Sequence, residues 1–148
     1  MSFVEPPAYQ PMVGDPDDHR PNTTWALAAD PGDSSGRVDS ITVLFERCAP
    51  GDRIPLHVHE TDEAVVLHAG SVEYVLGGSR RRVAAGATVF IPAGTPHGML
   101  NDTDDVAVVT AIFPTTKLSF KYLASNPEPG RTGITNTEMQ YLDPRAPA

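Results

Sequence analysis

Cysteine is almost absent from the chain: Cys48 is the only one among 148 residues, which excludes an intrachain disulfide. We therefore expect a reducing compartment, the cytoplasm, and a small buried side chain at Cys48 rather than a catalytic thiol. No apolar run approaches the ~20 residues of a membrane helix, and residues 1–11 do not resemble a signal peptide. The chain also lacks the Gly-x-Ser-x-Gly motif of serine hydrolases, the Gly-x-Gly-x-x-Gly motif of dinucleotide-binding proteins and a phosphate-binding P-loop.

Positive charge is scarce as well. Eleven Lys and Arg residues stand against 19 Asp and Glu residues, for a net charge of -8. Nucleic-acid binding needs a basic face, and the one basic run, Arg80-Arg81-Arg82, is more simply explained as the solvated edge of a hairpin. An acidic surface also disfavours anionic membranes. We expect a small-molecule partner, and neither nucleic acid nor membrane.

Glycine and proline are plentiful, with 12 and 15 residues, and they separate many short β-branched and aromatic segments. No segment shows a sustained helical period. Strands spaced roughly 8–12 residues apart indicate an all-β sandwich or barrel. We divide the chain into an extended Pro-rich arm (1–22), a β-barrel (23–123) and a C-terminal loop or tail (124–148), in which 136–142 could form one helical turn. The predicted strands are 23–29, 40–47, 54–59, 63–68, 72–76, 81–84, 88–91, 97–100, 106–113 and 118–123.

The stretch from Gly51 to Gly70 contains the first signs of chemistry. His57 and His59 are two residues apart, so both imidazoles lie on one face of a strand. A short polar turn then leads to Glu63. If the chain doubles back there, the carboxylate returns beside the two rings, which makes a divalent metal site.

His97 follows a Pro-x-Gly turn at the start of a later strand and can complete a set of three histidines and one glutamate. Such a set suits one divalent ion of Fe, Mn, Ni, Zn or Cu and leaves positions open for substrate. His68 lies at an odd offset from Glu63, so it should face outward. We expect His19 to be solvated in the arm.

Two motifs make this pattern specific. The segment Gly51-x5-His57-x-His59-x3-Glu63-x6-Gly70 resembles the first motif of the cupin superfamily at every defined position. The segment Gly86-x5-Pro92-x-Gly94-x2-His97-x3-Asn101 resembles the second, after a 15-residue spacer similar to that of microbial single-domain cupins.

The resemblance implies a double-stranded β-helix, or jelly-roll barrel, with a metal near one end of its interior. It implies His57, His59, Glu63 and His97 as the metal ligands. The glycines, Pro92 and Asn101 of the motifs carry over as turn and fold positions only. Cupins are commonly dimers, so a homodimer is also expected.

The walls of the site should be apolar, because few Lys or Arg residues lie on the same strand faces as the ligands. Val65, Leu67 and Met99 share those faces, and aromatic residues are candidates for the rest. The predicted substrate pocket is Phe45, Val65, Leu67, Tyr74, Met99 and Phe113, with Trp25 and Phe90 as further candidates. Such a pocket favours a largely apolar, phenolic or enolic substrate over a sugar phosphate.

Three functions fit these features. The favoured one is a metal-dependent dioxygenase similar to the quercetin-dioxygenase-like cupins, with Glu63 as both ligand and catalytic proton acceptor. The second is a zinc cyclase, isomerase or lyase; one known cupin type of polyketide cyclase resembles a four-histidine site, from which Glu63 departs. The third is a non-catalytic protein that binds a metal or small ligand. A helix-turn-helix segment would favour a regulator, and we predict none.

Overall fold

The computed structural model describes residues 2–6, 8–12, 22–123 and 138–145. The predicted position of His19 lies outside these residues, as does most of the segment between the barrel and the last strand. Within the described ranges, no helix has the length and apolar character needed to cross a membrane.

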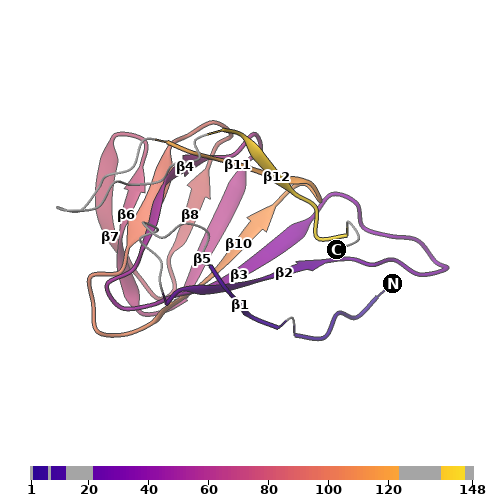
Figure 1. Cartoon of the computed structure of the whole chain (residues 1–148), viewed down its shortest axis with the longest axis horizontal. Coiled ribbons are helices and arrows are strands. Elements are labelled where there is room, and N and C mark those ends of the chain that lie inside the picture. The colour runs from indigo at the N-terminus through magenta and orange to yellow at the C-terminus, as the bar shows by residue number, and fades with distance from the viewer. Residues whose placement is uncertain (1, 7, 13–21, 124–137, 146–148) are drawn as a thin grey trace.

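Two antiparallel sheets of six strands each form the fold, and they face each other across one core (Figure 1). The first sheet has, in spatial order, β1 (Gln10–Pro11), β2 (Thr24–Ala29), β3 (Thr42–Cys48), β10 (Ala107–Phe113), β5 (Glu63–Ala69) and β8 (Thr88–Ile91). The second has β12 (Gln140–Leu142), β11 (Leu118–Tyr122), β4 (Arg53–Val58), β9 (His97–Leu100), β6 (Ser71–Leu76) and β7 (Ser79–Ala84). The predicted all-β jelly-roll barrel is confirmed.

Strand alternation decides which side chains reach the core. On β5, Glu63, Val65 and Leu67 are buried toward the second sheet, whereas His68 is exposed on the outer face. The inward residues of both sheets form one hydrophobic cluster in which Phe113 is fully buried. A single core between two sheets follows from this period of two.

Positive φ angles explain two glycines of the motifs. Gly70 has a φ of 78°, and a Cβ there would lie 2.9 Å from the carbonyl oxygen of Val106. Gly94, with a φ of 74°, donates its N–H to the carbonyl of His59. These turns therefore fix where β6 and β9 begin.

Asn101 is fully buried and ties the end of β9 to two neighbouring segments. Its side-chain amide donates to the carbonyls of Cys48 and Asp105, and its backbone N–H donates to the carbonyl of Asp52. Because a buried amide without partners is costly, this network holds the loop before β4 against β9.

The chain departs from expectation near both ends. Gln140–Leu142 forms β12, paired with β11, so the predicted helical turn over 136–142 is wrong where it is described. The pairing offered by the free edge of β11 decides the conformation there, and this partner cannot be read from local sequence. Within the predicted arm, Gln10–Pro11 pairs with β2.

Candidate metal centre

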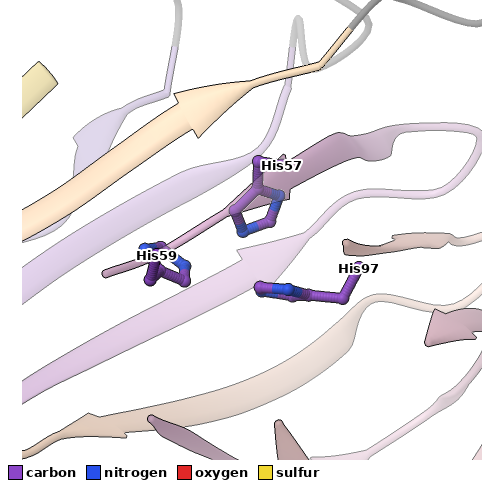
Figure 2. A group of neighbouring side chains, drawn as sticks. All are labelled: His57, His59 and His97. Atoms are coloured by element: carbon purple, nitrogen blue, oxygen red, sulfur yellow. The ribbon is translucent and has the colours of Figure 1, made fainter. Parts of the chain in front are cut away.

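Three imidazoles meet inside the barrel, from one end of β4 and the start of β9 (Figure 2). His57 and His97 are direct cross-strand partners, with ring centroids 4.2 Å apart. The ring of His59 lies 4.9 Å from that of His57 and 5.2 Å from that of His97. One ring nitrogen of each lies within 4.8 Å of the others, close enough for one ion to bind all three.

A bulge positions the two strands for this meeting. The pairing of β4 with β9 shifts register between Ile54 and His57, where Pro55 cannot donate a ladder hydrogen bond. Gly98 packs against the bulge, since a Cβ at Gly98 would lie 2.6 Å from the carbonyl oxygen of Ile54. The bulge and the glycine together let the backbone beside His97 approach the backbone before His57.

Backbone carbonyls set the tautomer of each ring. Nδ1 of His57 lies 2.7 Å from the carbonyl oxygen of Pro55, and Nδ1 of His97 lies 2.8 Å from that of Thr95. Nδ1 of His59 bonds the carbonyl of Ser119. A carbonyl oxygen only accepts, so Nδ1 must carry the proton. In each neutral ring, Nε2 is then the unprotonated nitrogen, as in many metal-binding histidines.

Glu63 completes the group from the opposite sheet. Its Oε2 atom lies 2.8 Å from Nε2 of His97 and 3.5 Å from Nε2 of His59. Glu63 and His97 are buried, and neither Oε2 of Glu63 nor Nε2 of His97 has a hydrogen-bond partner within the described part of the chain. With Nδ1 protonated, these atoms are two acceptors in contact, an arrangement that requires a cation or a further proton.

The surroundings of His59 favour its neutral form. Burial lowers the pKa of His59 from its usual 6.5, although the Glu63 carboxylate opposes the shift. Metals bind the neutral imidazole. The donor set thus fits a divalent transition metal, and the structure brings together the four residues predicted as ligands.

A cavity of about 490 Å³ opens beside this cluster. Of the residues predicted to form the substrate pocket, Val65, Tyr74, Met99 and Phe113 line it, and so does Trp25. Most of the remaining wall is apolar or aromatic, contributed by Met12, Leu44, Ile54, Leu118, Phe120, Tyr122 and Leu142.

Three other predicted wall residues do not line the cavity. Phe45 is on the outer face of β3, because its neighbours Leu44 and Glu46 point inward. Leu67 points inward as predicted, but it packs in the hydrophobic core two residues beyond Val65 and does not line the cavity. Phe90 is 74% exposed on the outside of β8.

Glu46 is a cavity residue that the sequence reasoning missed. It is only 8% exposed and lies on β3 between Trp25 of β2 and Val109 of β10. The sequence contains a signal for this position. Glu46 is two residues before Cys48, which we expect to be buried, so the two side chains share one face of the strand. The prediction that Phe45 points inward is incompatible with that pattern.

Two polar residues of the cavity wall were also not predicted. Gln10 of β1 and Gln140 of β12 line the cavity, so short strands from near both ends of the chain contribute to its wall. Two further expectations agree with the structure: His68 is exposed and contacts the hydroxyl of Thr110, and Cys48 is a free, buried thiol.

Comparison with curated proteins gives two partial matches. The chain is 40% identical over 67 residues to quercetin 2,3-dioxygenase of Bacillus subtilis, covering 45% of this chain and 19% of that protein. It is 31% identical over 81 residues to the HTH-type transcriptional activator RhaS of Mannheimia succiniciproducens, covering 55% and 30%. The chain therefore spans less than a third of the length of either relative.

Solved structures show the same fold. The polyketide cyclase RemF of Streptomyces resistomycificus superposes with a TM-score of 0.61 at 24% identity, over 77% of this chain and 79% of that one. The S161A mutant of Bacillus subtilis oxalate decarboxylase OxdC gives 0.62 at 18% identity, over 77% and 30%. The model of the cupin domain (Cupin_2) matches residues 44–113. Residues 44–113 therefore form a cupin domain, which contains both histidine motifs.

Proposed function

We propose that the chain is a metal-dependent oxygenase acting on a small, largely apolar substrate with a phenolic or enolic hydroxyl. One observation carries the proposal: the unpartnered acceptor atoms of His97 and Glu63 face each other at 2.8 Å, beside an apolar cavity of about 490 Å³. A buried polar cluster that opens into an apolar pocket is the usual form of an active site.

The metal would be held by Nε2 of His57, His59 and His97, with Glu63 as the carboxylate ligand. Iron, manganese, nickel or copper in such a site would supply the coupling between bound substrate and O2, which a closed-shell organic substrate lacks by itself. The Nδ1 hydrogen bonds to backbone carbonyls orient the rings before a metal arrives.

The cavity wall supports an uncharged substrate. Among the lining residues in the described part of the chain there is no Lys or Arg, and Glu46 and Glu63 contribute negative charge. An anionic substrate would enter without a counter-charge from the wall, at a large desolvation cost. Aromatic rings such as Phe113, whose ring lies 4.9 Å from that of His59, instead suit stacking against an aromatic substrate.

Two side chains can take part in proton transfer or hydrogen bonding to the substrate. Glu63 can accept the proton of a substrate hydroxyl, because a carboxylate within hydrogen-bond reach acts as a general base. Burial, together with the charges of Glu63 and Glu46, raises the pKa of Tyr74 well above its usual 10. Its hydroxyl therefore stays protonated and presents a hydrogen-bond donor to the substrate.

The proposed oxygenase function is supported by the match to quercetin 2,3-dioxygenase, which covers 19% of that protein. The non-oxidative alternative, a cyclase, isomerase or lyase, has support from the polyketide cyclase RemF, whose likeness extends to the fold alone. Both would use the same cluster, so the difference lies in oxygen consumption.

The test is O2 uptake by protein loaded separately with Fe(II), Mn(II), Ni(II), Cu(II) or Zn(II), given a panel of flavonols, phenols and cyclic enols. We expect substrate-dependent uptake with at least one redox-active metal. Glu63→Gln should lower the rate about 100-fold or more, the typical contribution of a general base. Zinc-dependent turnover that proceeds equally under argon would contradict the oxygenase and support the non-oxidative alternative.

A further inference from the structure

The cavity wall carries a second polar group, away from the histidine cluster. Glu46 of β3 lines the cavity and is only 8% exposed, and its cross-strand partner is Trp25 of β2. Trp25 is paired in turn with Gln10 of β1, which also lines the cavity. Side chains directly opposite each other in antiparallel strands share one face, so these three form one row, which we call the remote group.

The strand registers place the remote group far from the metal centre. Val109 of β10 is paired with Glu46 on one side and with Leu67 of β5 on the other. Leu67 is four residues beyond Glu63 on β5. At the usual dimensions of a sheet, Glu46 therefore lies about 13 Å along the strands from Glu63 and about 10 Å across them. A ligand bound at the centre must extend through the cavity to reach Glu46.

Between these two polar groups the cavity wall is apolar. Leu44 and Val65 line it from the row that lies between Glu46 and the metal centre. Ile54 and Met99, which are paired with each other in the second sheet, line the same cavity. A volume of about 490 Å³ is sufficient for a drug-sized molecule. The lining therefore fits a rigid apolar body with one polar group at each end.

We propose that Glu46 determines substrate specificity by accepting a hydrogen bond from a second hydroxyl group, at the end of the substrate remote from the hydroxyl that reacts. This inference rests on the proposed function, in which the reacting hydroxyl lies at the metal centre. An ionised carboxylate has about four lone-pair sites, so Glu46 can bind a substrate hydroxyl besides any contact within the protein. A hydrogen bond to a charged acceptor is also stronger than one to a neutral acceptor.

The neighbours of Glu46 restrict the chemistry of that remote group of the substrate. A carboxylate or phosphate would meet Glu46 without a counter-charge, because no Lys or Arg lines the cavity in the described part of the chain. The indole N–H of Trp25 donates to the carbonyl of Pro11, so the ring presents aromatic surface beside Glu46. A neutral hydroxyl on an aromatic ring satisfies both neighbours.

The experiment compares two probes that differ by one hydroxyl, 4-phenylcatechol and its derivative with a hydroxyl at the far end of the phenyl ring. Their dissociation constants are measured by calorimetry under argon with Zn(II)-loaded protein. The wild type should bind the hydroxylated probe about tenfold or more tightly, because a buried acceptor rejects a ligand that leaves it unpaired. Glu46→Leu should abolish that preference, and Glu46→Gln, which keeps a carbonyl acceptor, should retain part of it.

Glu73→Leu is the matched control, because Glu73 pairs with Arg80 and does not line the cavity. It should keep the wild-type preference, and thermal unfolding of each variant checks that it is folded. Equal affinity of the wild type for the two probes, or binding of neither, would overturn the proposal. An unchanged preference in folded Glu46→Leu or, if that variant does not fold, in Glu46→Gln would also overturn it.

Binding under argon requires no turnover, so the two proposals fail separately. A preference that depends on Glu46, in a protein that consumes no O2 with any metal or substrate, would support the role of Glu46 and contradict the oxygenase. Substrate-dependent O2 uptake without such a preference would support the oxygenase and contradict the role of Glu46.

Discussion

Burial, at the scale of single residues, decides which side chains of this chain can react. Cys48 is fully buried between the sheets, and burial raises the pKa of its thiol from 9.0 to about 12. The thiolate is the reactive form, so this cysteine is inert at neutral pH despite being the only one in the chain. The same burial makes the folded state sensitive to alkaline pH.

The first prediction therefore concerns Cys48. In the folded protein at pH 8 it should not react with a thiol-specific reagent, whereas unfolding in denaturant should expose one reactive thiol per chain. Because the folded pKa is raised, the contribution to stability is complete below pH 9 and is lost between pH 9 and about 12. Over that window the free energy of unfolding should fall by about 1.4 kcal/mol per pH unit from this group.

Denaturant titrations of the wild type and Cys48→Ala at pH 8 and pH 10.5 measure this effect. The variant is less stable at both values, since it leaves a small cavity. Its stability should nevertheless decline less with pH than that of the wild type. Equal decline in the two proteins, or rapid labelling at pH 8, would show that the thiol is not protected as described.

The faces of the clustered histidines were predictable from sequence because their spacing fixes them. The period of two in a strand puts His57 beside His59 and turns His68 away. Phe45 was wrongly predicted to line the pocket, because alternation from the buried Cys48 turns Glu46 inward and Phe45 outward. Leu67 shows a different limit, since alternation gives the face of a residue but not its depth along the barrel.

At the scale of elements, the close approach of β4 and β9 holds the centre together. Gly98 has an ordinary φ, so its role is the lack of a Cβ against the Ile54 carbonyl, not conformational freedom. It is at an undefined position of the second motif, and the register shift beside Pro55 could not be inferred from local sequence. The pairing of β4 with β9 brings these residues together from positions far apart in the chain.

Gly98→Ala should force the two backbones apart. We expect a loss of about 1–3 kcal/mol in the free energy of unfolding, as for overpacking in a core. Since His57 and His97 are paired across this contact, affinity for Ni(II) should also fall about tenfold or more, as for loss of an outer-shell contact.

Gly78→Ala is the matched control, because a Cβ at Gly78 would meet no atom within 4 Å and its φ is not positive. It should change stability by less than about 1 kcal/mol, as expected for a Gly-to-Ala change that introduces no strain. Its Ni(II) affinity should match that of the wild type. Unfolding titrations and calorimetric Ni(II) binding provide both numbers, and equal behaviour of the two variants would contradict this role for Gly98.

At the scale of the whole molecule, the two sheets have separate tasks. The second sheet supplies His57 and His97, with His59 directly after β4, and the first sheet supplies Glu63. The sequence predicted the barrel and the clustering of His57, His59, Glu63 and His97, because both motifs describe local turns and strands. It did not predict that Gln10 and Gln140 line the cavity, since they come from opposite ends of the chain and reach the cavity only through strand pairing.

The central claim is that His57, His59, Glu63 and His97 form one metal centre. The most direct measurement is the metal content per chain, by mass spectrometry after loading and desalting, for the wild type, His97→Ala and His68→Ala. His68 is an exposed histidine on the outer face and serves as the control. We predict close to one ion per chain in the wild type and in His68→Ala, and little or none in His97→Ala. Full occupancy in a folded His97→Ala protein would contradict the account.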